Sequence, residues 1–494
     1  MIPFNLFKEL WVADLKQHAS AYTGDLPSYP TAEPESLVSA SHVVSFEIGT
    51  GASIYTRSLL PAILNAKHEI ILVTCFWAPS TTLDALRDTL QQLATLRAER
   101  ARTMHRDRRT LPRLKIQICF SSRSLFQKLF HPRTGDGYIY PPSTWISKLG
   151  LPDPQLLEAG LIDLRVKTLF FLPFSVMHPK FLIIDAERAW LPSANVSWEP
   201  WLEGCIEITG ETVAALLKFY HEVWARELRT DGEPSGTGSL QQQNDNTPSA
   251  SKLHFASIQS PATNKITLQL NDVPTILLPS SHHRNPQFRP FPWQQSPSPP
   301  VTPLNCAILR LLAMAKKSIY VQTPNLTSTA VINALLEALG RGIEVTVVTS
   351  KGMMILEQVL TGGTITSWCL RTFVKRYKRL VKSFTHTGEG PEGSNGIIDL
   401  EAGPSKLGSL EIFYFHPLRE NQQVPEEPVH SHLKLVTIDD EYAVLGSGNM
   451  DRASWFTSQE LGILFHSNQL VRHVSNAVSQ ARRGRVSQYF TSKH

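Results

Sequence analysis

The sequence has few cysteines, no long apolar run and no strong excess of charge of one sign. Its five cysteines are scattered along 494 residues and are never spaced as C-x-x-C. An odd number of cysteines without paired spacing argues against a disulfide framework and a zinc site, and it favours a reducing compartment. A net charge of +5 permits attraction to anionic membranes or nucleic acid without requiring either.

The sequence also lacks segments that would carry it into or across a membrane. No uninterrupted apolar run reaches the roughly 18–20 residues that span a bilayer. The N-terminus has no basic beginning, and Lys8 and Glu9 interrupt any apolar core that a secretory signal would need. We therefore expect an intracellular protein, either cytoplasmic or peripherally attached to a membrane.

One motif is present twice in the same register. His178, Lys180 and Asp185 are spaced as H-x-K-x4-D, and ten residues after the aspartate follows an asparagine that lies two residues after a serine. The second half of the chain repeats this spacing. The first copy is completed by Ser193 and Asn195, and the second consists of His432, Lys434, Asp439, Ser447 and Asn449. Two copies in one register indicate an internal duplication.

The order of helical and strand patterns around the motifs is also duplicated. In each half a helix leads into a short apolar strand, followed by an amphipathic helix, another strand and the strand of the motif. We expect helices near 54–66, 81–97, 304–315 and 327–340, the last ending at Gly340, and strands near 70–74, 114–120, 181–184, 319–323, 343–349 and 435–438. This alternation predicts an α/β fold of two homologous halves with mixed, mostly parallel sheets flanked by helices, related by a pseudo-twofold axis.

The composition of the segments between the motifs predicts the organisation of the chain. Residues 232–249 contain almost no apolar side chain, which predicts disorder. Residues 387–408 are rich in glycine and acidic residues and predict a loose loop. We expect an N-terminal extension (1–44), a first half (45–230), a disordered linker (231–252), a Pro/Ser-rich connector (253–300), a second half (301–470) and a basic C-terminal tail (471–494).

Paired histidines, lysines and asparagines suit the chemistry of a phosphodiester. The diester is anionic and its leaving alkoxide is poor, so cleavage needs charge neutralisation, a nucleophile and a proton donor. A neutral imidazole can attack phosphorus while a protonated one donates to the leaving oxygen. Lysines two residues after each histidine lie on the same side of an extended strand and supply positive charge. This chemistry requires no metal or other cofactor.

With these residues the chain resembles the phospholipase D superfamily, which is named for its duplicated H-x-K-x4-D motif. The resemblance covers roughly 45–230 and 300–470, and residues 446–455 look very typical of it. It departs from the usual pattern at Pro179 and at Pro192, which replaces a glycine. Neither change removes a reacting group, so an active, metal-independent enzyme is expected.

The resemblance implies a role for each residue of the site. His178 is the expected nucleophile, which forms a phosphohistidine, and His432 the general acid and later base. An acidic residue after each asparagine orients a histidine, and the matching positions are Glu207 and Glu460. From the sequence itself, Asp185 and Asp439 are expected to anchor the ends of their strands or to pair with a cation, and not to take part in catalysis.

The expected substrate is a phospholipid head group, hydrolysed or transferred to an alcohol, with peripheral membrane contact. A chain with both motifs holds a complete site, so a monomer is expected. A nucleic-acid phosphodiesterase is the alternative, and a non-catalytic binding pocket is a third. Two basic stretches, 97–113 and 371–382, suit either anionic partner, and the second has the pattern of an interfacial helix.

Four further features have two interpretations each. Trp198, Trp201 and Trp455 follow the asparagines and suit either an acyl or leaving-group pocket or the core. The pair His282-His283 lies in a Pro/Ser-rich segment without another ligand nearby, which favours solvated side chains over a metal site.

Overall fold

The structure is a computed structural model of the whole chain. It describes residues 2–18, 33–106, 110–124, 127, 137–171, 175–225, 262–280, 298–387, 406–418 and 426–493. The expected linker at 231–252, most of the loop at 387–408 and His282-His283 lie outside these residues.

The first part of the chain comprises an N-terminal helix, which packs on the rest of the molecule, and the first motif-bearing half. Its helical segments are α1 (Phe4–Gln17), η2 (Pro34–Leu37), α2 (Gly51–Ile54), η3 (Tyr55–Leu59), α3 (Leu60–Leu64), α4 (Thr81–Arg106), η4 (Pro142–Thr144), η5 (Trp145–Leu149), α6 (Pro154–Ala159) and α7 (Glu211–Val223). Its strands are β1 (Val38–Thr50), β2 (Glu69–Phe76), β3 (Leu114–Ser122), β4 (Tyr138–Ile139), β5 (Ile162–Thr168), β6 (Phe181–Ile184), β7 (Arg188–Pro192) and β8 (Trp201–Thr209).

The second half begins after a long strand, β9 (Asn264–Pro279), which lies within the expected Pro/Ser-rich connector. Its helices are α8 (Pro303–Met314), α9 (Thr329–Gly340), α10 (Ile355–Gly362), α11 (Thr366–Thr387), α12 (Arg452–Phe456) and α13 (Asn468–Arg482). Its strands are β10 (Ser318–Gln322), β11 (Glu344–Ser350), β12 (Leu410–Phe415), β13 (His430–Ser431), β14 (Leu435–Ile438), β15 (Tyr442–Gly446), β16 (Leu461–His466) and β17 (Val486–Thr491).

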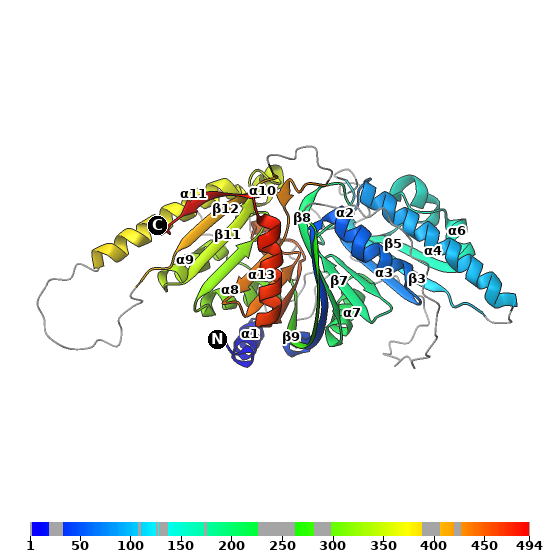
Figure 1. Cartoon of the computed structure of the whole chain (residues 1–494), viewed down its shortest axis with the longest axis horizontal. Helices are drawn as coiled ribbons and strands as arrows, with labels where there is room; N and C mark the ends of the chain where they lie inside the picture. Colours follow the sequence, from blue (N-terminus) through cyan, green and yellow to red (C-terminus); the bar gives the residue numbers. More distant parts are fainter. Residues whose placement is uncertain are drawn as a thin grey trace, which may run out of the picture.

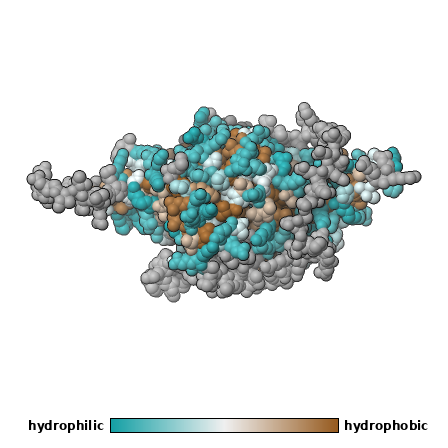
Figure 2. Space-filling view, turned by 90° about the horizontal axis from the view of Figure 1, so that it is seen from below, coloured by the Kyte–Doolittle hydropathy of each residue, from teal (hydrophilic) through white to brown (hydrophobic). Residues whose placement is uncertain are grey.

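Hydrogen bonds join the strands into one mixed sheet that runs through both halves. Its order is β4-β5-β3-β2-β6-β7-β8-β1-β9-β16-β15-β14-β10-β11-β12-β17, and β13 adds to β8. Strands β8 and β9 stand near the middle of the molecule, with the two sets of helices spread to either side (Figure 1). Seen from below, hydrophobic side chains gather toward the middle of a largely hydrophilic surface (Figure 2).

The two halves repeat one pattern of strand pairing. Strand β2 pairs in parallel with β3 and antiparallel with the motif strand β6, and β10 pairs in the same senses with β11 and the motif strand β14. Strand β6 begins directly after Lys180, and β14 begins directly after Lys434. Each H-x-K triplet therefore precedes the equivalent strand of its half. The duplication seen in the sequence is therefore also a duplication of local topology.

The observed elements agree with the expected ones in type, with three differences. The sheet is mixed, but only five of the sixteen strand pairings among the described residues are parallel, because hairpins and the long strand β9 add antiparallel pairs. Residues 471–493 are not a free tail but most of α13 and the strand β17, which pairs with β12. Helix α9 includes Gly340, and the glycine with positive φ after it is Gly342.

Apolar packing follows this arrangement. One cluster of buried side chains lies within the first half, around β2, β3, β5 and α4. The larger cluster joins strands of both halves with α1, α7, α8 and α13. Trp11 of α1 is fully buried in it and donates its indole N–H to the carbonyl of Pro303. The two halves therefore share a core, which fixes the position of one motif relative to the other.

Candidate active site

Each motif lysine lies beneath its own histidine at the start of a short buried strand. Lys180 and Lys434 precede β6 and β14 and are almost completely buried. The ammonium of Lys180 donates to the carbonyl oxygen of His178 at 3.0 Å, and that of Lys434 to the carbonyl of His432 at 2.6 Å. The i, i+2 spacing therefore builds the same small unit twice.

The motif aspartates anchor the strand ends and take no part in the pocket. Asp185 accepts the backbone N–H groups of residues 67, 68 and 69, and Asp439 accepts those of residues 316, 317 and 318. Both aspartates have positive φ, at the turns that follow β6 and β14. Each carboxylate thus ties the turn after a motif strand to the beginning of the neighbouring strand, as the sequence predicted.

The chain just before each motif crosses to the opposite half. The backbone N–H of His178 donates to the carbonyl of Gln459 at 2.9 Å, and that of His432 donates to the carbonyl of Leu202 at 2.8 Å. Gln459 precedes β16, and Leu202 belongs to β8. Each motif is therefore held against the strand that follows the asparagine of the other motif.

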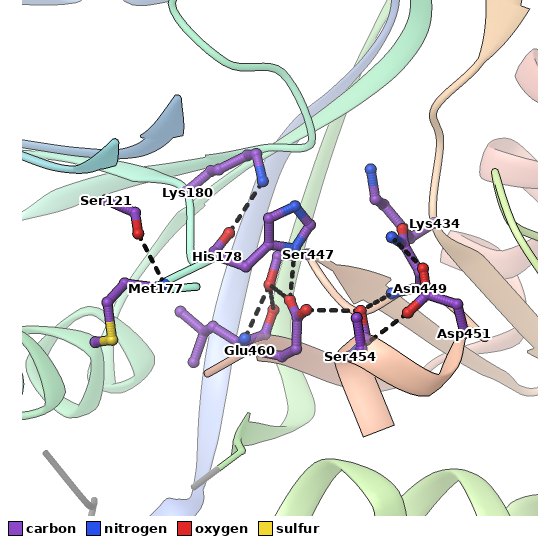
Figure 3. A network of polar contacts seen from close by, with 12 residues as sticks. Ser121, Met177, His178, Lys180, Lys434, Ser447, Asn449, Asp451, Ser454 and Glu460 are labelled. Carbon is purple, nitrogen blue, oxygen red and sulfur yellow. Dashed lines mark hydrogen bonds and ion pairs between the residues drawn. The ribbon is translucent and has the colours of Figure 1, made fainter. Parts of the chain in front are cut away.

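This crossing gives each histidine a carboxylate from the other half. The Nδ1 atom of His178 lies 2.8 Å from Oε2 of Glu460, and the Nδ1 atom of His432 lies 2.7 Å from Oε1 of Glu203. A carboxylate at Nδ1 favours the tautomer that carries its proton there, which leaves Nε2 as the atom free to react. Figure 3 shows the first of these pairs, with Glu460 below the His178 ring.

A serine supports each carboxylate in the same way. Ser447 donates to Glu460, and Ser193 donates to Glu203. The backbone N–H that follows each glutamate, of Leu461 or Gly204, donates in turn to that serine. The motif serines are therefore placed to fix the carboxylates that hold the histidines.

The expectation that Glu207 holds a histidine is wrong, because Glu203 does. Glu207, which lies farther along β8, accepts from Ser45 and forms an ion pair with Arg188. Glu207 lies twelve residues after Asn195, close to the eleven between Asn449 and Glu460, whereas Glu203 lies only eight after Asn195. The short helix α12 lengthens that interval in the second half only. The same contacts join the serine and the glutamate in both halves, and these contacts identify Glu203.

Both half-sites open into one pocket of about 270 Å³. Its lining includes both histidines and both asparagines of the motifs: His178, Asn195, His432 and Asn449. Phe76, Ser122 and Glu199 come from the first half, whereas Met354, Glu357 and Asp451 come from the second. The structure thus brings the two motifs together at the junction of the halves.

The asparagines are held differently. The Oδ1 atom of Asn195 accepts the backbone N–H of Phe76 at 3.2 Å, which leaves its amide N–H groups available. The amide of Asn449 donates to Asp451 at 3.0 Å. Asp451 also caps α12 by accepting the N–H of Ser454. It is a pocket residue that sequence reasoning missed, although it lies only two positions after Asn449.

The two histidines differ in exposure. The side chain of His178 is 15% exposed, whereas that of His432 is 3% exposed. The ring of Trp201 lies 4.8 Å from that of His432 and covers it. Of the three tryptophans near the asparagines, Trp201 lines the pocket, Trp198 is exposed beside Phe76, and Trp455 is buried in the core.

Burial lowers the pKa values of the basic side chains of the site. It lowers the pKa of His178, although Glu460 opposes the shift. It lowers the pKa of His432 to about 3 against the opposing effect of Glu203, and that of Lys434 to about 7. The lowered pKa values favour the neutral form of both imidazoles. An anionic ligand would favour their protonated forms, so the site is built to gain positive charge as it binds an anion.

No group of three or more His, Cys, Asp or Glu side chains is arranged for a metal ion among the described residues. No helix of that part of the chain is long and apolar enough to cross a membrane.

Comparison with known proteins finds a likeness in sequence for the second half. Residues 308–481 match the family model of the phospholipase D-like domain of cardiolipin synthase. No curated protein matches the sequence. The match agrees with the resemblance to the phospholipase D superfamily, and the matched residues make up most of the second half.

A solved structure resembles nearly the whole chain in fold. A phosphatidylserine synthase from Haemophilus influenzae Rd KW20 superposes with a TM-score of 0.50 at 14% identity, over 97% of this chain and 92% of that one. Nuc, a phospholipase D family member from Salmonella typhimurium, matches 37% of this chain and 90% of its own at 16% identity, with a TM-score of 0.25. The first of these likenesses extends the shared fold across both halves.

Proposed function

We propose that this protein is a phosphodiesterase that cleaves the head groups of phospholipids, or transfers the phosphatidyl group to an alcohol, through a phosphohistidine. The observation that carries the proposal is the pair of histidines in one pocket, each held at Nδ1 by a carboxylate from the opposite half. Such a pair provides one nucleophile and one proton donor. Two buried lysines beneath them provide charge for an anionic phosphorus centre.

In the proposed reaction, His178 is the nucleophile, and His432 acts first as the general acid and then as the general base. The Nε2 atom of His178 attacks phosphorus, the bond from phosphorus to the head-group oxygen breaks, and that oxygen takes a proton from His432. His432 then removes a proton from water or an acceptor alcohol, whose oxygen attacks phosphorus and breaks the P–N bond. Glu460 and Glu203 steady the positive charge on the imidazoles during these steps.

The greater exposure of His178 supports its assignment as nucleophile, because the attacking atom must reach phosphorus. The covered His432 suits the acid, since a proton donor shielded from bulk water delivers its proton to the leaving oxygen alone. Because burial lowers the pKa of His432 to about 3, this imidazole gains its proton together with the anionic substrate.

Lipid as the substrate class is supported by two comparisons. The matched family model is described from cardiolipin synthase, and the fold neighbour over most of the chain is a phosphatidylserine synthase. A nucleic-acid diester is the competing substrate, since exposed arginines of α4 could contact a phosphate backbone.

One panel of assays tests this function. Purified protein is incubated with phosphatidylcholine, with phosphatidylglycerol and with single-stranded DNA, and released head group or cleaved strand is measured against the His178→Ala variant. Release of head group by the wild type alone supports the proposal. Cleavage of DNA with intact lipids would overturn the substrate class, and inactivity toward all three would overturn the enzymatic function.

A further inference from the structure

Helix α10 turns its apolar side chains away from the protein. Its apolar residues are exposed, with fractions of 71% for Leu356 and 53% for Leu360, and Ile355 and Val359 are exposed to a similar degree. The residue that α10 buries is polar: Gln358 is 5% exposed. An ordinary surface helix has the opposite pattern, with apolar residues inward and polar residues outward.

The fold holds this helix in place by polar contacts. The side-chain oxygen of Gln358 accepts the N–H and the hydroxyl of Thr366, and its amide donates to the carbonyl of Met353. Residues with positive φ, Met354 and Gly363, stand at the two ends of α10. Eight residues are too few for a stable isolated helix, so these contacts keep α10 in position with its apolar face outward.

Helix α10 lies at the mouth of the active-site pocket. Met354 and Glu357 line the pocket, and α10 packs on α12, which follows Asn449 and Asp451. From the first half, Trp198 is 59% exposed and its ring contacts that of Phe76, which also lines the pocket. Exposed apolar side chains of both halves therefore lie next to lining residues of the pocket, and we call Trp198, Ile355, Leu356, Val359 and Leu360 the apolar rim.

A basic surface continues from the apolar rim along α11. Helix α11 buries Phe373 and Tyr377 against the body and exposes most of its basic residues, whereas Arg376 is half-buried and donates to Asn333, and the helix contains no acidic residue. Figure 1 shows α10 and α11 following each other along one side of the second half. The exposed basic residues are Arg371, Lys375, Lys378, Arg379 and Lys382. Apolar side chains beside a row of cations match a bilayer whose head groups are anionic.

We propose that the apolar rim inserts into the surface of an anionic membrane while the basic face of α11 lies on its head groups. In that position the mouth of the pocket faces the lipid, so a head group can enter without leaving the bilayer. This inference rests on the proposed action on phospholipids. It also explains why the rim lies next to lining residues of the pocket, because a protein partner seated there would close the pocket.

Vesicle binding of full-length protein tests the proposal. Sedimentation with vesicles of phosphatidylcholine containing phosphatidylglycerol gives a partition coefficient for the wild type and for Leu356→Ser/Leu360→Ser. Since transfer of one leucine side chain from water is worth roughly tenfold in an equilibrium constant, we expect the double variant to bind at least about tenfold more weakly.

Matched controls separate the rim from general hydrophobicity and charge. Leu6→Ser/Leu96→Ser removes two leucines that are 46% and 43% exposed on α1 and α4, and it should bind like the wild type. Arg371→Gln/Lys375→Gln/Arg379→Gln should bind about tenfold or more weakly to anionic vesicles and unchanged to pure phosphatidylcholine. Arg100→Gln/Arg102→Gln/Arg106→Gln, three exposed arginines of α4, should bind as the wild type does.

Three results would overturn the docking surface. The first is that the wild type does not sediment with anionic vesicles. The second is that the rim variant binds to them as well as the wild type does. The third is that the wild type is a dimer in sedimentation velocity and that the rim substitutions convert it to a monomer. The last result would assign α10 to contact between copies of the chain.

A soluble substrate distinguishes this inference from the proposed function. The rim variant should hydrolyse a monomeric short-chain phosphatidylglycerol at the wild-type rate, because the substitutions lie outside the pocket. Vesicle binding without any lipid hydrolysis would overturn the function and leave the docking surface standing. Hydrolysis of monomeric lipid without vesicle binding would overturn the docking surface and leave the proposed function standing.

Discussion

The two half-sites have the same parts in different surroundings. In each, a histidine is held by a carboxylate of the other half, a serine holds that carboxylate, and a lysine lies beneath the histidine. His178 is partly exposed, whereas His432 is covered by the ring of Trp201. Duplication therefore supplies equal chemical groups, and their neighbours make them unequal.

The largest expected effect separates the two histidines. His178→Ala should abolish turnover, by a factor on the order of 10⁵–10⁶, because no nucleophile remains to form the intermediate. His432→Ala should lose about 10²–10⁴-fold with a natural substrate, since only proton transfer is removed. With a substrate whose leaving group needs no proton, it should still accumulate labelled phosphohistidine.

Rapid quenching with labelled substrate and mapping of the label measures this difference. Label on residue 432 in the wild type would reverse the assigned roles. Label on neither histidine would replace the covalent mechanism with direct attack by water. Circular dichroism of both variants controls for loss of fold.

The carboxylates give a smaller effect and a matched control. Glu203→Gln should reduce kcat by about 10²-fold or more, because an amide no longer stabilises the charged imidazole of His432. Glu207→Gln should leave kcat close to that of the wild type, since Glu207 contacts Ser45 and Arg188 instead. Steady-state kinetics with a thermal melt of each variant tests this pair. Equal losses in both variants would contradict the assignment of Glu203.

The sequence predicted the parts of the site well because duplication makes a weak motif specific. The register of His, Lys, Asp and Asn in both copies indicated one pocket, and the strands 181–184 and 435–438 agree with β6 and β14. The anchoring role of the aspartates also followed from their place at strand ends.

The rest depended on contacts between segments far apart in the chain. The pairing of His432 with Glu203 arises where β13 meets β8 of the other half, and no local pattern records that meeting. Strand β9 was not predicted, because it lies within a segment rich in proline and serine. The pattern of α11 did predict a basic helix, but its aromatic side packs on the body and not on a membrane.

A third prediction concerns the buried lysine of the second half-site. Burial lowers the pKa of Lys434 from 10.5 to about 7. Between these values the unfolded chain binds a proton that the folded chain has lost, so stability should rise with pH across this window. Lys434→Met removes this share of the rise and, because it also removes the cost of burying a cation, should melt about 5 °C above the wild type at pH 7 while losing activity. Melting curves at pH 7 and pH 10 measure both effects. A lower melting temperature for Lys434→Met at pH 7 would show that the ammonium stabilises the fold.

The smallest expected effect is that of a chelator. Lys180 and Lys434 supply positive charge beneath both histidines, and the proposed steps pass protons between His178, His432 and the substrate, so no step requires a divalent cation. Activity toward a monomeric short-chain lipid should therefore be the same with and without EDTA. The monomeric substrate matters because calcium alters the surface of anionic vesicles and would change binding at the apolar rim without touching the pocket. Activity that disappears with EDTA and returns with magnesium or zinc would contradict the mechanism. An EDTA effect confined to vesicles would belong to the membrane surface and would leave the proposed roles of both half-sites standing.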